Sequence, residues 1–215
     1  MSLIRKNRSI DADSNIKEEI LSFLSNTYST SKDNQYSVYK YKDKWIVDSR
    51  RSLAVIDYNI SYLTNGLFEF GDINGNFDCG RCKNLKSLKG GPKYVAGYFD
   101  CSKCKNLTSL EGAPVKVNGY FSCISCEKII NLKGSPKYAY DFYCSFCDSL
   151  ISLEGGPVKV SGIFNCESCK NLISLEGSPK YNLLFNCSNC ESLQDFTHGP
   201  KKTRNGFKYD NIKNK

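Results

Sequence analysis

The sequence has one histidine, one tryptophan and one methionine among 215 residues, and it lacks the short motifs that mark common active sites. We find no G-x-x-x-x-G-K-S/T phosphate loop, no H-E-x-x-H zinc motif and no G-x-S-x-G nucleophile turn. The single histidine, His198, stands beside the last proline, where we interpret it as a surface loop residue and not a base. We therefore expect no enzymatic activity and predict no catalytic residues.

Long apolar runs are also missing, so no segment of the sequence predicts a transmembrane helix. The basic residues near the N-terminus are not followed by the apolar segment of a secretory signal. A mean hydropathy of −0.44 and a charged fraction of 24% predict a soluble, folded chain. We expect a cytoplasmic location.

The net charge of +8 is concentrated at the C-terminus. Residues 201–215 contribute +5, from six Lys or Arg and one acidic residue, whereas residues 1–70 contribute +1 and residues 71–200 contribute +2. A basic tail can contact nucleic acid, but no basic stripe is evident along the body of the chain. Nucleic-acid binding is therefore the weaker of the two binding hypotheses below.

What the sequence does contain is a repeat of about 22 residues. All twelve cysteines fall in six C-x-x-C pairs, whose first members are spaced 22, 22, 21, 22 and 21 residues apart. Around each pair, a phenylalanine stands two residues before, an aliphatic residue three residues after, and a proline ten residues after the second cysteine. These six prolines are all the prolines in the chain. A fixed period of this length is typical of solenoids.

The physical chemistry of one repeat predicts its shape. In Phe-x-Cys, the two named side chains point to the same face of a short strand. The Gly- and Pro-containing stretch that follows cannot hold a long helix and should return as turns or a single 3₁₀ turn. Turns stacked about 4.8 Å apart would pair the strands into a parallel sheet over a continuous core. In the two 21-residue repeats, Tyr138 and Tyr181 are expected where Val95, Val117 and Val160 stand elsewhere.

We therefore predict a repeat β-solenoid with short parallel strands, little helix and a small α+β N-terminal cap. Residues 1–52 are assigned to the cap, with a helix over residues 15–28 behind the cap-like Asp13 and Ser14, then a β-hairpin that turns near Lys42, Asp43 and Lys44. Residues 53–215 are assigned to the solenoid, with six C-x-x-C turns over about residues 75–200 and degenerate capping turns at both ends.

The 22-residue period also predicts which residues the two capping turns place in the repeat columns. For the leading turn, it places Val55 in the Phe column, Asp57 and Ile60 in the two Cys columns, and Leu63 in the Leu column. For the last turn, it places Phe207 in the Phe column and Tyr209 and Ile212 in the Cys columns.

The string F-x-C-x-x-C-x-N-L-x-S-L-x-G-x-P-x-x-V-x-G resembles a leucine-rich repeat of the cysteine-bearing, short-repeat type. This resemblance covers roughly residues 53–212, and it implies that Phe99 and Cys101 are strand-core residues and Cys104 a ladder residue. The phrase NLTSLEGAPVKVNGYF is similar to repeats in uncharacterised proteins of tailed bacteriophages and large DNA viruses. By analogy it implies a viral protein in the host cytoplasm that blocks or sequesters a host or defence protein.

Three interpretations of the cysteines stay open. They can be structural thiols that fill small buried positions, zinc ligands from pairs on adjacent turns, or disulfides. The replacement of the cysteine columns by Asp57, Ile60, Tyr209 and Ile212 in the capping turns favours structural thiols. We therefore predict no metal ligand and no cofactor, with zinc at the cysteine columns as the alternative.

What remains is a macromolecule-binding solenoid, for which we expect a protein partner on the strand face, taken to be concave. Outward columns of variable residues flank each Phe, and exposed Tyr and aliphatic side chains are typical interface anchors. The expected contacts are Asp78, Tyr98, Asp100, Tyr120, Ser122, Asp141, Tyr143, Ile163, Asn165, Leu184 and Asn186. The equal alternative is an exposed strand face that is simply rich in β-forming residues.

The second hypothesis is a nucleic-acid or phosphate binder that uses the basic tail and a column of lysines after the prolines. That column is expected to run Lys93, Lys116, Lys137, Lys159, Lys180 and Lys201, and it can equally be a solvated edge. We expect no membrane contact, and the sequence does not determine the oligomeric state, with a monomer favoured.

Overall fold

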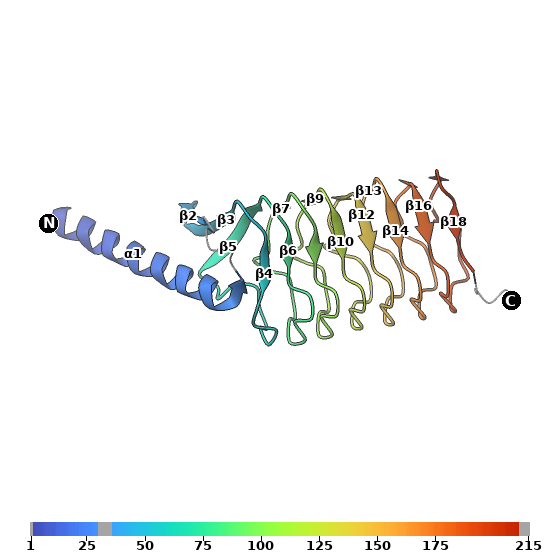
Figure 1. The fold of residues 1–215 in the computed structure, drawn as a ribbon, viewed down its shortest axis with the longest axis horizontal. Coiled ribbons are helices and arrows are strands. Elements are labelled where there is room, and N and C mark those ends of the chain that lie inside the picture. The colour runs from blue at the N-terminus through green and yellow to red at the C-terminus, as the bar shows by residue number, and fades with distance from the viewer. Residues whose placement is uncertain (1, 30–35, 211–215) are drawn as a thin grey trace.

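The protein is a single β-solenoid with a helix at its N-terminal end, as Figure 1 shows. The computed structural model describes residues 2–29 and 36–210, and in this view the turns stack in a nearly straight row. The predicted repeat β-solenoid with short parallel strands and a small N-terminal cap is confirmed. Within the described residues, no helix is long and apolar enough to cross a membrane.

Each cysteine-bearing turn contributes the predicted Phe-containing strand to a nine-stranded sheet. Neighbouring strands from β4 onward pair in parallel, and from β6 onward phenylalanine lies opposite phenylalanine. In spatial order the sheet contains β1 (Tyr28–Ser29), β4 (Leu53–Val55), β6 (Phe77–Asp78), β8 (Phe99–Asp100), β10 (Tyr120–Ser122), β12 (Asp141–Tyr143), β14 (Ile163–Asn165), β16 (Leu184–Asn186) and β18 (Phe207–Lys208).

Most turns also carry a second strand after the proline, which the sequence analysis did not predict. These segments are two residues long, too short to show the period-two alternation by which a strand is recognised. One sheet of seven strands contains β13 (Lys159–Val160), β11 (Tyr138–Ala139), β9 (Lys116–Val117), β7 (Tyr94–Val95), β5 (Phe68–Ile73), β3 (Lys44–Ser49) and β2 (Tyr36–Tyr41). A separate pair contains β15 (Tyr181–Asn182) and β17 (Lys202–Thr203).

The core is built from columns of identical residues that stack along the solenoid. Phe77, Phe99, Phe121, Phe142, Phe164 and Phe185 are fully buried, and their ring centroids follow one another at 5.0 to 5.4 Å with nearly parallel planes. All twelve cysteines and the first aliphatic residue after each pair are buried beside them. One turn alone could not bury this set, so the stacked neighbours supply its hydrophobic stabilisation.

The N-terminal cap continues the solenoid rather than standing apart from it. Strand β1 pairs antiparallel with β4, and strand β3 of the hairpin pairs parallel with β5. The helix α1 (Ser2–Thr27) buries Ile20 and Leu24, and the ring of Phe23 packs edge-on to Phe68 at 5.9 Å. The Tyr28 ring seals the first turn against Phe70 and Phe77, and its hydroxyl donates to the Leu63 carbonyl at 2.5 Å.

Two predictions about the cap differ from the structure in detail. The helix begins at Ser2, well before residue 15, so Asp13 and Ser14 lie inside it and do not cap it. No glycine or proline interrupts residues 2–27, so nothing in that segment ends a helix. The hairpin is present, and its turn residues Lys42 and Asp43 have φ angles of 47° and 64°, the left-handed conformation of a tight hairpin turn.

The predicted register of the leading turn is wrong. Strand β4 pairs Leu53 with Phe77, so Leu53 and not Val55 occupies the Phe column, and Val55 follows two residues later beside the first Cys column. Asp57 is exposed, where a core column was expected. The reason is length, because this turn spans 24 residues from Leu53 to Phe77 and the period in the other turns is 22 or 21.

The register of the last turn agrees with the prediction where the structure describes it. Phe207 pairs with Phe185 in the Phe column. Tyr209 is exposed, and the Phe196 and Phe207 rings lie against its ring at 6.3 and 5.4 Å. Ile212 lies outside the described residues.

Candidate binding surface on the nine-stranded sheet

The outward side of the nine-stranded sheet carries the eleven residues predicted as partner contacts. The parallel register aligns Asp78 with Asp100, Asp100 with Ser122, and so on through Tyr143, Asn165 and Asn186. The preceding column likewise aligns Tyr120 with Asp141 and Ile163 with Leu184. All are half-buried except Ser122, which is buried and shares a 2.7 Å hydroxyl contact with Ser102.

Several of these residues have a clear structural task. The side chains of Asp78, Asp100, Asn165 and Asn186 each accept a hydrogen bond from the amide two residues later, at 2.7 to 3.0 Å. These bonds are Asx turns, which start the C-x-x-C turn, where the residue before each second cysteine has a positive φ. The Asx turns require Asp or Asn at these positions, so the identity of four of the predicted contact residues is explained without a binding partner.

Asp141 has a comparable role between turns. Its carboxylate accepts a 2.6 Å hydrogen bond from the amide of Ile163 in the next turn, as Asn76 does from the amide of Tyr98 at 3.0 Å. The Tyr143 hydroxyl also lies 3.3 Å from the Asp141 carboxylate. This pattern shows that Asp141 braces adjacent strands.

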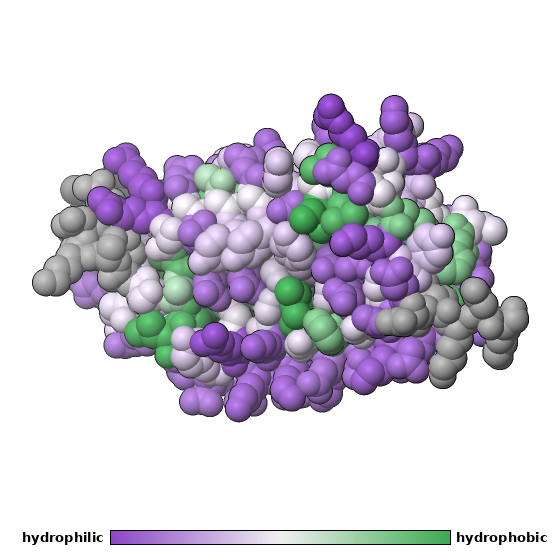
Figure 2. Space-filling model, turned by 45° about the vertical axis from the view of Figure 1, so that its right-hand side comes forward, coloured by the Kyte–Doolittle hydropathy of each residue, from purple (hydrophilic) through white to green (hydrophobic). Residues whose placement is uncertain are grey.

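Five of the predicted contacts remain with no such task, and we refer to them as the tyrosine stripe. They are Tyr98, Tyr120, Tyr143, Ile163 and Leu184. The Tyr98 and Tyr120 rings are stacked, with centroids 4.7 Å apart and planes inclined by 2°, and Tyr143 meets Tyr120 edge-on at 6.0 Å. Figure 2 shows the surface as a mosaic of apolar patches between hydrophilic ones, so no single large apolar face dominates that view.

The surroundings of this surface raise the pKa values of its tyrosines and of one carboxylate. Burial, with the charges of Asp100 and neighbouring groups, raises the pKa of Tyr120 to about 12. Burial also raises the pKa of the Tyr98 hydroxyl. Burial and the adjacent Asp100 raise the pKa of Asp78, although the Gly80 amide and Arg81 act in the opposite direction. The hydroxyls are therefore available as hydrogen-bond donors at neutral pH.

The cysteines form a hydrogen-bonded column beneath this surface, which we call the thiol ladder. The thiol of each second cysteine from Cys104 onward donates to the carbonyl of the first cysteine in the preceding turn, at 3.1 to 3.2 Å. Burial raises the pKa of Cys79 and Cys144 well above the usual range, and that of Cys187 to about 12. The raised pKa values favour the protonated thiol at Cys79, Cys144 and Cys187, whereas metal ligation needs thiolates. For Cys190, in contrast, the hydrogen bond with Cys166 lowers the pKa.

The described part of the chain contains no group of three or more His, Cys, Asp or Glu side chains arranged to hold a metal ion. All twelve cysteines are free thiols in this structure. His198 lies in an exposed turn, with its ring nitrogen 3.6 Å from the Asp195 carboxylate.

The lysines that follow the prolines do not form the predicted single column. Lys116 pairs with Tyr94 on one side and with Tyr138 on the other, and Tyr138 pairs in turn with Lys159. A valine stands directly after Pro114 and Pro157, where the other turns have their lysine, so Lys116 and Lys159 come one residue later. The lysines are therefore divided between two columns. Lys116 and Lys159 occupy one, and Lys93, Lys137, Lys180 and Lys201 occupy the other.

The same register corrects the expected places of Tyr138 and Tyr181. Ala139 pairs with Val160 in the inward column, so Tyr138 points outward beside the lysines. Asn182 takes the inward place in the other short turn, and Tyr181 is 61% exposed. The signal was present in the sequence, because counting two residues from each proline yields Tyr94, Lys116, Tyr138, Lys159, Tyr181 and Lys202.

No family model matches the chain, and neither a curated protein nor a solved structure matches it.

Proposed function

We propose that the protein is a non-catalytic binding scaffold that holds a protein partner on the tyrosine stripe. The observation that carries the proposal is the stacked pair of Tyr98 and Tyr120, extended by Tyr143, on a sheet whose neighbouring outward residues are committed to turns. Aromatic side chains already held in place lose little conformational entropy when a partner covers them, which is why Tyr is enriched at energetic centres of interfaces.

The flanking charges favour a particular partner chemistry. Asp78 and Asp100 lie side by side at one end of the stripe, and Asp141 lies within it. Ile163 and Leu184 pair at the other end. A segment with Lys or Arg side chains next to aromatic or aliphatic ones would meet complementary groups along this whole surface.

The viral resemblance of the repeat extends this proposal to a protein that blocks or sequesters a host or defence protein. The identity of the captured partner tests that extension, because a partner from the chain's own source, with no role in defence, would contradict it.

The test is a quantitative binding assay on a partner captured from lysate and then purified. Replacing Tyr98, Tyr120 and Tyr143 together by Ala is expected to raise the Kd at least 100-fold, since each buried aromatic anchor contributes about 1–2 kcal/mol. The matched control replaces by Ala three exposed tyrosines outside the stripe, and it should change the Kd less than about threefold. These are Tyr138 and Tyr181 on the post-proline strands and Tyr140 in the bend before β12. Equal losses in both variants, or retention by the first, would refute the proposed site.

A further inference from the structure

The stack of post-proline strands is interrupted at one place. Strands β7, β9, β11 and β13 pair in sequence, and β15 pairs with β17, but β13 (Lys159–Val160) and β15 (Tyr181–Asn182) are not paired with each other. Backbone hydrogen bonding between these two turns resumes just beyond the unpaired strands, where the Leu183 amide donates to the Gly162 carbonyl at 2.8 Å. The interruption therefore lies between two strands that sit in adjacent turns.

A polar residue occupies a core position at this break. Asn182 stands in the inward column that Val95, Val117 and Val160 fill elsewhere, and it is only 8% exposed. Neither its side-chain nitrogen nor its side-chain oxygen has a hydrogen-bond partner. A buried amide without partners costs free energy that a valine would not, so its presence indicates a use other than packing.

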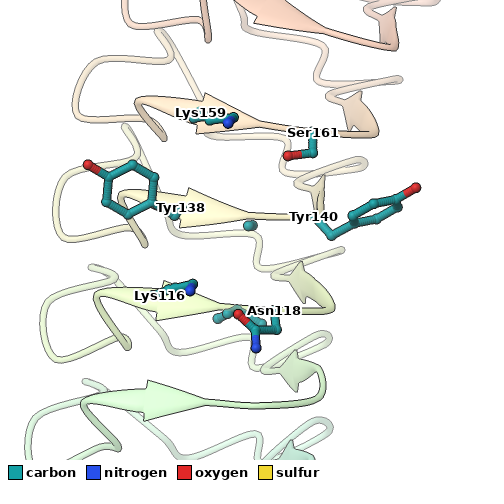
Figure 3. Close-up of a pocket in the computed structure, with 8 residues that line it drawn as sticks. Lys116, Asn118, Tyr138, Tyr140, Lys159 and Ser161 are labelled. Carbon is teal, nitrogen blue, oxygen red and sulfur yellow. The ribbon is translucent and has the colours of Figure 1, made fainter.

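The break opens into a hollow on the outward side. A space of about 570 Å³ is lined by Asn182 together with Ser161, Tyr181 and Leu183 and by the cations Lys159, Lys180 and Arg204. A second space of about 400 Å³, shown in Figure 3, continues it toward Lys116 and Asn118. The two spaces share Tyr138, Lys159 and Ser161, so they form one groove along the solenoid axis.

The groove is cationic. Lys116, Lys159, Lys180 and Arg204 line it, and no acidic residue does. Among the described residues, none of these four cations forms an ion pair within 4.0 Å, and Lys116 instead lies over the Tyr94 ring at 5.9 Å. By contrast, some lysines on other loops pair with acidic residues of adjacent turns, such as Lys105 with Glu127 at 2.9 Å and Lys133 with Glu154 at 2.8 Å.

Aromatic rings alternate with the cations at the spacing of the turns. Figure 3 shows Lys116, Tyr138 and Lys159 on three successive strands, and Tyr181 and Lys202 continue the order beyond the break. Tyr138 and Tyr181 are 45% and 61% exposed. Tyr138 and Tyr181 therefore stand two turns apart at the same place after their prolines, and Lys159 stands at that place in the turn between them.

We propose that this groove binds a single-stranded nucleic acid along the solenoid axis, with bases stacked on Tyr138 and Tyr181 and phosphates held by Lys159, Lys180 and Arg204. Positive grooves interleaved with aromatic side chains are the surfaces on which single strands bind, because an unpaired base offers its face to a ring. A duplex hides those faces, and an acidic peptide lacks them. The open groove also suits an extended strand better than a compact ligand. This site uses a different face from the tyrosine stripe.

The test measures fluorescence anisotropy of a labelled 12-nucleotide oligothymidylate with the full chain. The unmodified chain is expected to bind, with an affinity that falls as salt rises. Replacing Tyr138 and Tyr181 together by Ala should weaken binding at least tenfold. Asn182→Val restores the apolar column, so it should raise the thermal midpoint. Thr203→Val, in the same column one turn later, is the control and should leave binding unchanged. Replacing Lys159, Lys180 and Arg204 by Gln should reduce the slope of log K against log salt by about 2.

Three outcomes would overturn the proposal. One is no binding of the oligonucleotide at low salt, and another is unchanged binding by the variant with Ala at Tyr138 and Tyr181. The third is that a poly-glutamate peptide of equal charge displaces the labelled oligonucleotide as effectively as unlabelled oligonucleotide does. That result would assign the groove to an acidic protein. The variant with Ala at Tyr98, Tyr120 and Tyr143 should bind the oligonucleotide normally, so failure of this site is distinguishable from failure of the tyrosine stripe.

Discussion

The thiol ladder makes a prediction that separates hydrogen bonding from simple space filling. In the middle of the array, the buried Cys126 thiol donates to the Cys101 carbonyl at 3.2 Å. At the start of the array, the buried Cys82 thiol has no earlier cysteine turn below it and reaches only the Gly80 carbonyl of its own turn, at 3.8 Å. Cys126→Ala should therefore destabilise the protein more than Cys82→Ala.

The magnitude follows from the two positions. Each substitution removes one buried sulfur, which costs about 1 kcal/mol in lost burial and a small cavity. Cys126→Ala also leaves a buried carbonyl without its donor, which costs a further 1–3 kcal/mol or so. We expect a loss of about 2–4 kcal/mol in the free energy of unfolding for Cys126→Ala and about 1 kcal/mol for Cys82→Ala.

The assay is equilibrium urea unfolding followed by circular dichroism, with reductant present throughout and with parallel series measured without and with chelator. Cys126→Ser, which keeps a donor at the same place, should recover part of the loss. Equal destabilisation by Cys126→Ala and Cys82→Ala would refute the reasoning, since it would show that the thiols stabilise the core only by filling space and not by hydrogen bonding. A loss of stability on adding chelator to the unmodified chain would instead indicate a bound metal.

Two further predictions concern single positions near the C-x-x-C turns. Burial raises the pKa of Asp78 in the folded protein, so its ionised form opposes folding above that pKa, and the penalty disappears as pH falls below about 3.8. Asp78→Asn, which keeps the Asx turn as Asn165 does, should therefore stabilise the protein at pH 7 by up to about 1 kcal/mol, with no gain at pH 3; an equal gain at both pH values would contradict this cause. Lys103 has a φ of 62°, so Lys103→Gly should raise the unfolding free energy by about 0.5–1 kcal/mol, whereas Lys105→Gly, at a position without positive φ, should lower it. Thermal unfolding of the two glycine variants measures the difference, and a loss in both would show that the left-handed turn carries no strain.

The two candidate surfaces have different physical characters. The tyrosine stripe is half-buried, its hydroxyls have raised pKa values, and acidic residues flank it. The groove over the post-proline strands is open and lined by the cations Lys116, Lys159, Lys180 and Arg204. A repeat fold can carry both, because its outward columns vary while the inward Phe, Cys and Leu columns do not.

The sequence by itself determined the solenoid, its period and most of its core. Phe, Cys, Leu and Pro recur at fixed offsets, and a repeated column of this kind has one physical solution, which is to stack and bury itself. The outward columns of the nine-stranded sheet also followed from the Phe-x-Cys alternation. The sequence could not show that Asp78 and Asn165 cap turns, because Asp and Asn are equally at home on an exposed face.

Only the tertiary structure decided the second set of strands and what lies on it. Two-residue strands carry no periodic signal of their own, so their existence depends on the neighbours with which they pair. The alternation of Tyr138 and Lys159 emerged from that pairing, since cross-strand register and not spacing from the cysteines determines which side chains adjoin. The same holds for Asn182. Its column indicates that it faces the core, but only the structure shows that its side-chain amide makes no hydrogen bond.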